Sequence, residues 1–578
     1  MVAPFTFPQR PGDRHSLRRG ALPLFLAVLL APLAAYSQPM DTAPEDRNSD
    51  CVAGFSPDDL ALFNFVETRA QVNFGQYASR TIGSIEYRVL PIFNEQDPDE
   101  NNWLFRAANR LHIDTREGTL RKQMIIHAGE PLDPRTLTEN ERLLRSNGYL
   151  IDAMILPRRI CEDRIDLLVV VRDVWTFSPS VSASRTGGED SSDAGLSEDN
   201  LFGTGQSLSL GYYHDADRNG RTLRYRNPLI HERWAFRIGA ADNSDGEELD
   251  VSLIRPFYEL NSTWSAGAAS SYSSLRQEIE YNDQVINSYL QTREGYSAFL
   301  GWSQGRQNDT ISRWQFGVSS STERFRALDD TRTLPADERQ RYPWISWSFE
   351  EERFATADNI NRSHRQEDIQ LGFSHYVQLG YAHEDFDSDR NEVVFTLSTG
   401  YATYMNQRHL VHTQLYTRGQ RDSTAVRRTF FGSAAHYYYF INEKNRWYAR
   451  ISFDGARRIR EDEQLTIGGD DLRGYPDDYQ RGNRRWVMSI ERRRFSNWHI
   501  FNLAYVGVAG YIDVGSAWNT EGATPTSPET LANVGLGLRL SPSKFRVDKV
   551  LHIDVASPLV NRDEVDDHQI IVSGKVDF

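Results

Sequence analysis

The sequence predicts a mainly β protein: a transmembrane antiparallel β-barrel of about sixteen strands, preceded by one small α+β domain. Two observations predict this fold. From Thr176 to Phe578, short segments alternate apolar residues with small or polar ones, and Asp/Asn/Gly-rich turns separate them. Each segment therefore has one oily and one wet face, as strands between lipid and an aqueous lumen require. A soluble sandwich would instead bury the oily faces of two sheets against each other.

The composition agrees with a barrel. The mean hydropathy of −0.58 is that of a soluble protein, but a transmembrane β-strand needs only about ten residues with every second one apolar. The 26 Tyr and 12 Trp suit aromatic girdles at the two membrane interfaces. About 400 residues at roughly 25 per strand and connection give about sixteen strands, and a direct count of candidate runs is slightly higher. A net charge of −15 disfavours nucleic-acid binding.

Residues 1–37 are predicted to be a cleaved secretory signal. An apolar run from Ala21 to Ala35 is followed by Ala35-Tyr36-Ser37 before Gln38. The alternative is a single-pass membrane helix, for which about 15 apolar residues are short. Four arginines precede the apolar run, namely Arg10, Arg14, Arg18 and Arg19.

Residues 38–80 are predicted to form an N-terminal helical arm. Ser56-Pro57-Asp58-Asp59 has the pattern of a helix N-cap, and an apolar helical run from Leu60 to Val66 follows it. The two cysteines, Cys51 and Cys161, both precede the barrel. In an oxidising periplasm a disulfide between them would tie the arm to the next domain, and two unpaired thiols are the alternative.

Residues 81–175 are predicted to form an α+β domain. Alternation over Ile85, Tyr87 and Val89 indicates a strand, and 103–113 has helical spacing. Gly129-Glu-Pro-Leu-Asp-Pro134 then precedes a helix that contains Leu137, Leu143 and Leu144 and stops at Asn147-Gly148. Segments 149–155 and 165–171 are predicted to be strands, with the polar stretch 158–164 between them.

This order of elements, with a Gly-x-Pro turn before a helix that ends in Leu-Leu-Arg-Ser-Asn-Gly-Tyr149, resembles a POTRA domain. POTRA domains are the periplasmic modules of the BamA/TamA family of outer-membrane assembly and translocation proteins. Only one such unit is recognisable in this sequence, whereas family members usually carry two or more. This departure weakens the transfer of any specific pathway.

Two motifs in the barrel region also resemble this family. The first is the early turn Asn200-Leu201-Phe202-Gly203-Thr204-Gly205, whose glycines permit tight backbone angles. The second is Leu472-Arg473-Gly474-Tyr475, which resembles the arginine-bearing loop that folds back into the lumen. Gly474 is expected to allow a sharp reversal, and Tyr475 with Pro476 to stiffen it. The alternative is a solvent-exposed Arg-Gly turn.

The phase of the last strands predicts which side chains face the lumen. If Trp486, Met488 and Ile490 face lipid, Glu491 faces inward, and the same reasoning places other charged residues there. The predicted inward cluster consists of Glu491, Asp513, Arg539 and Asp554. Asp513-Val514-Gly515 resembles the family's Asp-x-Gly on the strand that receives the loop arginine. The resemblance implies that Arg473 pins the loop through Asp513, with Glu491 as a second partner.

The final strand places Ile570, Val572, Val576 and Phe578 on the lipid face and ends in an aromatic residue. This ending is similar to the C-terminal signal by which outer-membrane barrels are recognised for insertion. Gly574 falls on the same face. A glycine there weakens side-chain packing and would let the strand bend at the seam between the first and last strands.

Enzyme signatures are absent from the sequence, and no cofactor or metal is expected. Asp385-Phe-Asp-Ser-Asp389 hints at a calcium loop, but Arg390 occupies the position where the turn needs glycine. A barrel lipase would need a Ser/His pair near the lipid interface. His568 and Ser573 lie near the terminus, but Ser573 has the phase of a lumenal residue.

Over residues 81–578 the resemblance implies an outer-membrane protein of a Gram-negative bacterium that assists the insertion, assembly or translocation of other polypeptides. Its expected partners are outer-membrane lipids, unfolded or partly folded clients and periplasmic accessory proteins bound by the POTRA-like domain. A passive channel or a lipid-handling barrel is the alternative function.

Overall fold

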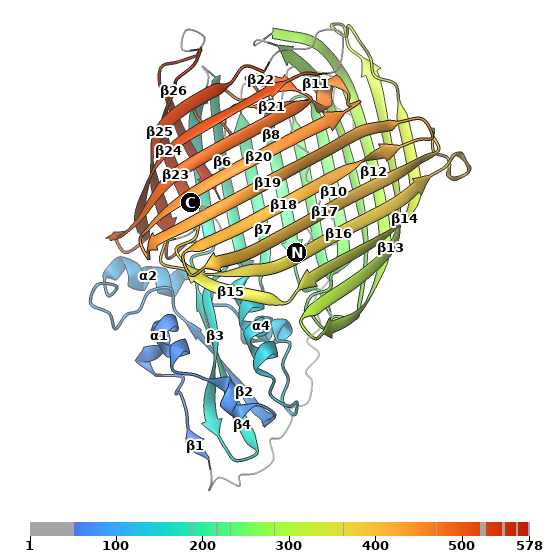
Figure 1. Ribbon diagram of the computed structural model, residues 1–578. Helices are drawn as coiled ribbons and strands as arrows, with labels where there is room; N and C mark the ends of the chain where they lie inside the picture. Colours follow the sequence, from blue (N-terminus) through green and yellow to red (C-terminus); the bar gives the residue numbers. More distant parts are fainter. Residues whose placement is uncertain are drawn as a thin grey trace.

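The computed structural model describes residues 51–575, apart from 187–188, 215–217, 232, 282–283, 362, 470, 521–527, 546–549 and 562–564. The predicted signal segment 1–37 and the terminal Val576 and Phe578 lie outside the described residues. The chain folds into an N-terminal α+β domain and a β-barrel that stands on it (Figure 1). Among the described residues, no helix is both long and apolar enough to cross a membrane.

The N-terminal domain is a four-stranded sheet with helices packed on it. The strand order is β1-β3-β4-β2; β2 runs parallel to β4, and β3 runs antiparallel to it. The strands are β1 (Val52–Ala53), β2 (Thr81–Leu90), β3 (Leu150–Ile160) and β4 (Arg164–Asp173). The helical segments are η1 (Leu60–Phe63), α1 (Phe65–Ala70), η2 (Phe74–Tyr77), α2 (Trp103–Leu111), α3 (Glu117–Gln123) and α4 (Pro134–Arg145).

Local chemistry explains these boundaries. Asp133 caps α4 by accepting from the backbone N–H groups of Arg135 and Thr136, and Pro134 occupies the first turn, where its missing N–H costs nothing. Leu137 and Leu144 of α4 pack with Val169 of β4 in the domain core. The structure also joins Cys51 to Cys161 by a disulfide, which ties the arm to the β3–β4 turn.

One boundary of this domain differs from the prediction. The polar stretch 158–164 was expected to be a connection, but β3 continues to Ile160, so only 161–163 turns. The arginines there are strand residues with ion pairs: Arg159 lies 2.7 Å from Asp166 and Arg158 lies 3.1 Å from Glu86. A strand that carries ion-paired arginines therefore has the same polar sequence pattern as a loop.

Residues 177–575 form a closed antiparallel barrel, which β27 and β5 close. The strands of its first half are β5 (Phe177–Thr186), β6 (Glu189–Leu201), β7 (Gln206–His214), β8 (Asn219–Asn227), β9 (Ala235–Asn243), β10 (Gly246–Arg255), β11 (Trp264–Tyr281), β12 (Gln284–Gln307), β13 (Thr310–Ala327), β14 (Glu338–Glu351) and β15 (Arg353–Asp358). Those of its second half are β16 (Gln366–Ala382), β17 (Glu392–Asn406), β18 (His409–Arg421), β19 (Val426–Asn442), β20 (Asn445–Arg457), β23 (Arg484–Ile500), β24 (Ala504–Trp518), β25 (Leu531–Pro542), β26 (Val550–Pro558) and β27 (Gln569–Lys575).

The barrel has more strands than the sixteen expected. Its described residues form twenty-one segments, and β14 and β15 pair with different parts of β16. Counting these two as one interrupted strand gives twenty. The estimate was low because the turns that face the N-terminal domain are short: only residues 308–309 connect β12 to β13, and only 407–408 connect β17 to β18.

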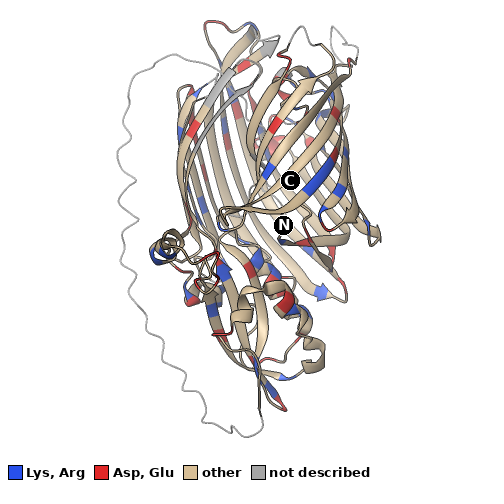
Figure 2. Cartoon of the chain, turned by 90° about the vertical axis from the view of Figure 1, so that its left-hand side faces the viewer, with Lys and Arg blue, Asp and Glu red and all other residues tan. Residues whose placement is uncertain are grey.

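The barrel strands separate an oily outer face from a polar inner face. On β24, Val508 and Ile512 are exposed on the outside, whereas Tyr511 and Asp513 are buried inside. Near the N-terminal domain, Trp264, Trp302, Trp314 and Trp347 lie opposite one another on four successive strands. Such a row is typical of an aromatic girdle at a membrane interface. In Figure 2 the barrel strands are mostly tan, and blue and red residues crowd the domain below.

Candidate functional site in the barrel lumen

The segment between β20 and β23 folds into the lumen and is called the lumenal loop (residues 458–483). Its base is a short hairpin in which β21 (Leu465–Ile467) pairs with β22 (Gln480–Gly482). Gly468 and Gly469 adopt φ values of 144° and 49°, which favour glycine. The N–H of Gly469 donates to the carbonyls of Tyr475 and Pro476, 3.0 and 3.1 Å away. Gly468 and Gly469 therefore form the chain reversal that follows β21.

Gly474 has a different role from the one predicted. It is not among the positive-φ glycines, so it does not form the reversal. A Cβ atom on Gly474 would lie 2.6 Å from the Cβ of Asn533 and 3.2 Å from the backbone nitrogen of Pro558. The missing side chain lets the loop backbone lie directly against the barrel wall.

Arg473 makes a two-pronged ion pair with Asp513. Its Nε lies 2.9 Å from Asp513 Oδ2, and its Nη2 lies 2.7 Å from Asp513 Oδ1. Nη2 also lies 2.9 Å from Glu491 Oε1. The guanidinium carbon lies 3.3 Å from the centre of the Tyr511 ring. Only 7% of the Arg473 side chain and 1% of the Asp513 side chain are exposed, so the pair is shielded from solvent.

Other inward side chains complete this site. Ser489 Oγ donates to Asp513 Oδ1 (2.7 Å), and Asn533 Nδ2 donates to Asp513 Oδ2 (3.0 Å). Arg493 Nε lies 2.8 Å from Glu491 Oε2, so each carboxylate has at least two partners. Such shared donors hold the acceptors rigidly in place for the loop arginine.

The predicted inward residues all lie inside the barrel, and Arg539 and Asp554 form a second ion pair there. Arg539 pairs with Asp554 at 2.9 Å, with both side chains fully buried or nearly so. The Tyr511 ring packs on Gly535 of β25, where a Cβ atom would lie 2.3 Å from the ring. Glycine at 535 thus leaves room for the ring on which Arg473 stacks.

Apolar packing supports the polar site. Leu472 and Tyr475 are fully buried in a cluster with Ile467, Val487 and Leu531. The Tyr475 hydroxyl oxygen lies within hydrogen-bond distance of the carbonyls of Ala532 and Val560, at 3.0 and 2.9 Å respectively, and its single proton can be donated to either. All four residues of the Leu-Arg-Gly-Tyr motif therefore contact or lie against the wall formed by β23, β24 and β25.

The first residues of the lumenal loop, ahead of the β21–β22 hairpin, are held by β13 and β19. Arg460 Nη1 lies 2.5 Å from Glu323 Oε2 on β13, and Arg428 Nη2 on β19 lies 2.5 Å from Glu463 Oε1 in η4 (Glu461–Glu463). Arg428 also pairs with Glu323, at 3.4 Å. The loop thus crosses the lumen with ion pairs at both ends. No sequence motif marks this second anchor, because Glu323 lies more than a hundred residues from both Arg428 and Arg460.

A second segment crosses the other end of the lumen. The β15–β16 connection reaches across to the C-terminal strands, where the N–H of Ser363 donates to Ser541 Oγ (3.4 Å) and the His364 ring lies 4.0 Å from the Tyr505 ring. Ile360 packs inside the barrel on Leu410, Tyr438 and Tyr448. This segment (residues 353–371) is called the basal hairpin.

The N-terminal domain holds the basal hairpin with arginines. Arg145 of α4 pairs with Asp368 through two contacts, of 2.9 and 3.1 Å. The guanidinium carbon of Arg142 lies 3.5 Å from the centre of the Phe354 ring. Arg69 of α1 donates to Gln366 at 2.6 Å. A movement of this domain would therefore act on the hairpin directly.

The predicted early turn is also a contact with the N-terminal domain. Phe202, Gly203 and Gly205 have φ values between 55° and 72°. Asn200 Oδ1 accepts from the N–H of Gly205 (2.7 Å), which closes the turn behind Leu201, and Asn200 Nδ2 donates to Thr115 Oγ1 (2.8 Å). A Cβ on Gly203 would lie 2.3 Å from the carbonyl oxygen of Asp114. Glycine is thus required for close docking as well as for the turn.

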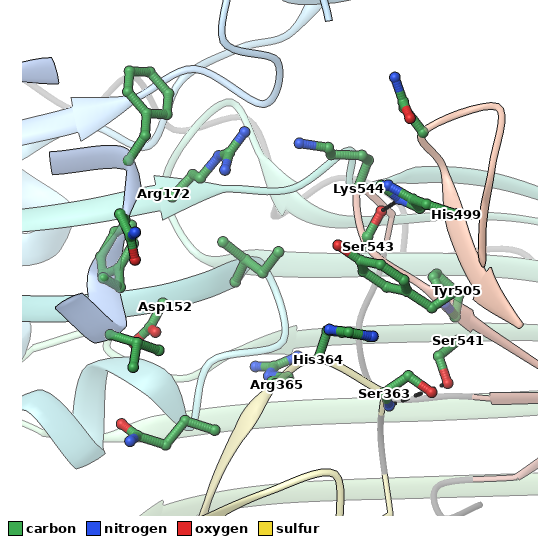
Figure 3. A pocket seen from close by; sticks show the side chains of 18 of the residues that line it. Asp152, Arg172, Ser363, His364, Arg365, His499, Tyr505, Ser541, Ser543 and Lys544 are labelled. Atoms are coloured by element: carbon green, nitrogen blue, oxygen red, sulfur yellow. Dashed lines mark hydrogen bonds between the residues drawn. The ribbon is translucent and has the colours of Figure 1, made fainter. Parts of the chain in front are cut away.

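A cavity of about 530 Å³ lies where the domain, the basal hairpin and the barrel turns meet (Figure 3). On the barrel side, the Tyr505 ring stacks on both His364 and His499, with centroids 4.0 and 4.1 Å apart. On the domain side, Glu100 lies between Lys544, with which it pairs, and Arg172, whose Nη2 is 3.2 Å away. The side chains that line this cavity include polar groups and groups of both positive and negative charge.

The charged groups at this junction have shifted pKa values. Burial, with a contribution from Arg172, lowers the pKa of Lys544 to about 8. Burial alone would raise the pKa of Glu100, but the Lys544 ammonium, the Asn94 N–H and Arg172 together outweigh it, so the Glu100 pKa is lowered. The carboxylate is therefore the favoured form of Glu100 while the domain is docked.

The last strand closes the barrel. Ile570 and Val572 are exposed on its outer face, and Gly574 lies opposite Leu551 of β26. His568 does not approach Ser573 as a lipase dyad would require. Its Nδ1 lies 2.7 Å from Ser557 Oγ, whereas Ser573 lies opposite His552.

The fold and site define the class as a closed antiparallel barrel with a tethered lumenal loop. No protein-family model matches the sequence. A UPF0398 protein from Levilactobacillus brevis is 30% identical over 54 residues, which are 9% of this chain and 29% of that protein. The chain thus spans less than a third of this curated relative.

Similar solved structures include BamA from Haemophilus ducreyi lacking POTRA domains 1–3, with 13% identity, 86% of this chain and 84% of that chain covered, and a TM-score of 0.37. CdiB from Acinetobacter baumannii has 12% identity, coverages of 85% and 73%, and a TM-score of 0.42. CdiB from Escherichia coli has 12% identity, coverages of 90% and 98%, and a TM-score of 0.36.

Proposed function

We propose that this protein is an outer-membrane β-barrel that assists the insertion, assembly or translocation of other polypeptides, with its N-terminal domain in the periplasm. The observation that carries the proposal is the buried Arg473–Asp513 pair, which holds the lumenal loop against the C-terminal strands. The Leu-Arg-Gly-Tyr motif that supplies this arginine resembles the corresponding loop motif of the BamA/TamA family.

The alternative function, a passive channel, does not explain why two segments cross this lumen. A channel needs a continuous aqueous path. Here the lumenal loop crosses between opposite walls, from Arg460–Glu323 to Arg473–Asp513. The basal hairpin reaches across the other end, from Asp368 to Ser541. Two tethered obstructions favour a barrel that works at its wall and not through an open pore.

Two edges of the protein suit the handling of extended polypeptides. β2 is an edge strand of the N-terminal sheet, and beyond its start, where residues 80–82 pair with 129–132, a client segment can add beside it through backbone hydrogen bonds. The barrel seam lies between β5 and β27, and the described part of β27 spans only seven residues. We take this seam, where the first and last strands of the barrel meet, as the place at which a new strand is admitted.

Depletion of the protein followed by quantitative proteomics of isolated outer membranes tests the proposal. We expect a defined set of outer-membrane or secreted polypeptides to decrease. Wild-type protein and the control Arg390→Ala, which changes an exposed arginine in an outer loop, should restore them, and Arg473→Ala should restore them poorly. An unchanged proteome with altered solute uptake or lipid composition would overturn the proposal in favour of a channel or a lipid-handling barrel.

A further inference from the structure

Helix α2 presents an apolar stripe that no other part of the described chain covers. Its exposed fractions are 74% at Trp103, 53% at Leu104 and 75% at Leu111. At about 100° per residue, these three and Ala107 lie within an arc of about 100°. Large apolar side chains gathered on one exposed face indicate an interaction surface.

The opposite face of α2 fixes the direction of this stripe. Phe105 is buried, and its ring stacks on Phe93 with centroids 4.0 Å apart. The N–H of Phe93 donates to Asn109 Oδ1 at 3.1 Å, and Asn102 caps the helix by accepting from the N–H of Phe105 at 2.9 Å. Because the helix is docked in this way, Trp103 and Leu111 must point away from the domain.

The helix lies at the rim of the barrel. Leu503 of the β23–β24 turn packs against the Phe93 and Phe105 cluster, and Asn502 Nδ2 donates to the carbonyl of Asp99 at 2.7 Å. This turn exposes Phe501 (83%), and the end of β23 exposes Trp498 (65%). Figure 1 shows α2 directly below the ends of β23 to β25. The exposed stripe of α2 and the exposed apolar residues at this end of the barrel therefore belong to neighbouring elements.

Charge beside the stripe agrees with an anionic partner. In the helical projection Arg106 and Arg110 lie on the same edge of the stripe, within about 60° of Trp103. Arg110 is exposed and Arg106 is partly exposed. Basic side chains that flank an aromatic and aliphatic face are the pattern of a helix lying in a membrane interface, with the cations at the phosphate level.

We propose that α2, together with the β23–β24 turn, lies in the periplasmic leaflet of the membrane and binds anionic phospholipid there. The proposal rests on the outer-membrane placement in the proposed function. It makes the N-terminal domain a second membrane contact beside the C-terminal strands of the barrel. The domain is then held at a fixed height and orientation beneath these strands, close to the seam.

Spin-label accessibility tests this surface in the full chain. Leu111→Cys is labelled in vesicles of phosphatidylethanolamine and phosphatidylglycerol, while Cys51 and Cys161 stay bonded to each other. The matched control is Glu86→Cys, on an exposed position of β2. We expect the ratio of oxygen to nickel-chelate collisions to be about tenfold higher at 111 than at 86. Charge reversal by Arg106→Glu with Arg110→Glu should lower this ratio severalfold.

Three results would overturn the inference. A label at 111 as accessible to the nickel chelate as the label at 86 places the stripe in water. A label shielded from both reagents places it against a protein, either an accessory partner or a second copy. An equal ratio in neutral phosphatidylcholine vesicles removes the role of anionic lipid. If the barrel floats with the vesicles and keeps its heat-modifiable mobility in these cases, the proposed function stands while this inference fails.

Discussion

Removing either partner of the Arg473–Asp513 pair should release the lumenal loop. The pair combines two short contacts of 2.9 and 2.7 Å with side chains at most 7% exposed. Breaking a buried pair by deleting one partner costs about 3–5 kcal/mol, because the other charge remains uncompensated. Here each remaining charge keeps other partners, so we expect costs at or just below the low end of that range.

The contacts that remain after each substitution determine which of the two substitutions costs more. Without Arg473, Asp513 keeps the donors Ser489 and Asn533. Without Asp513, Arg473 keeps Glu491 and the Tyr511 ring. We therefore expect about 3 kcal/mol for Arg473→Ala and about 2 kcal/mol for Asp513→Ala. Arg473→Lys should fall between wild type and Arg473→Ala, since an ammonium lacks the planar fork.

Proteolysis of the loop under native conditions measures this release. A change of about 3 kcal/mol corresponds to about a hundredfold increase in the population of the open loop, and hence in its cleavage rate when opening is fast. Chymotrypsin cleavage at Tyr479 reports the loop in protein reconstituted in lipid vesicles. Arg390→Ala is the control for loss of an arginine, and it should leave the rate unchanged.

A double-mutant cycle separates pairing from general damage. Because both substitutions remove the same interaction, Arg473→Ala with Asp513→Ala should cost less than the two single effects added, by about 1–3 kcal/mol. Strictly additive effects, or single variants that are cleaved no faster than wild type, would refute the reasoning that this pair fixes the loop.

Three further predictions concern the N-terminal domain. Reducing the bond between Cys51 and Cys161, which are 110 residues apart, should destabilise this domain by about 4 kcal/mol, seen as a lower Tm; an unchanged Tm would contradict it. The pKa of Glu100 is lowered from 4.5 in the docked state, so its charge stabilises docking above pH 4.5, and this stabilisation is lost as pH falls through the lowered pKa. Hydrogen exchange should therefore show that the domain undocks on acidification, and Glu100→Gln should remove that pH dependence. Arg145→Ala should free the basal hairpin and speed its proteolysis; equal rates would show that Arg145 does not hold it.

Much of the fold was predictable from local patterns. Alternation gave the direction of Glu491, Asp513, Arg539 and Asp554 because side chains on a strand change face at every residue. The β3–β4 boundary and α3 were not predicted, since ion-paired arginines resemble a polar loop and a seven-residue helix has little periodicity. The number of strands was underestimated because the turn length was assumed.

The candidate site was predictable only in part. Arg473 and Asp513 are in contact as the family resemblance implied, but Ser489 and Asn533 carry no motif and appear only once three strands lie side by side. The anchor between Arg460 and Glu323 and the basal hairpin depend on closure of the barrel. Such contacts join residues far apart in sequence, and no local pattern records them.

The most direct test of the proposed function is site-specific photocrosslinking at the seam in growing cells. A crosslinking residue at Phe177, at the start of β5, should capture outer-membrane or secreted polypeptides that mass spectrometry identifies. The same residue at Leu300, which is exposed on the outer face of β12 away from the seam, should capture lipid only. Equal capture at both positions, or capture of lipid alone at Phe177, would contradict a role of the seam in handling other polypeptides.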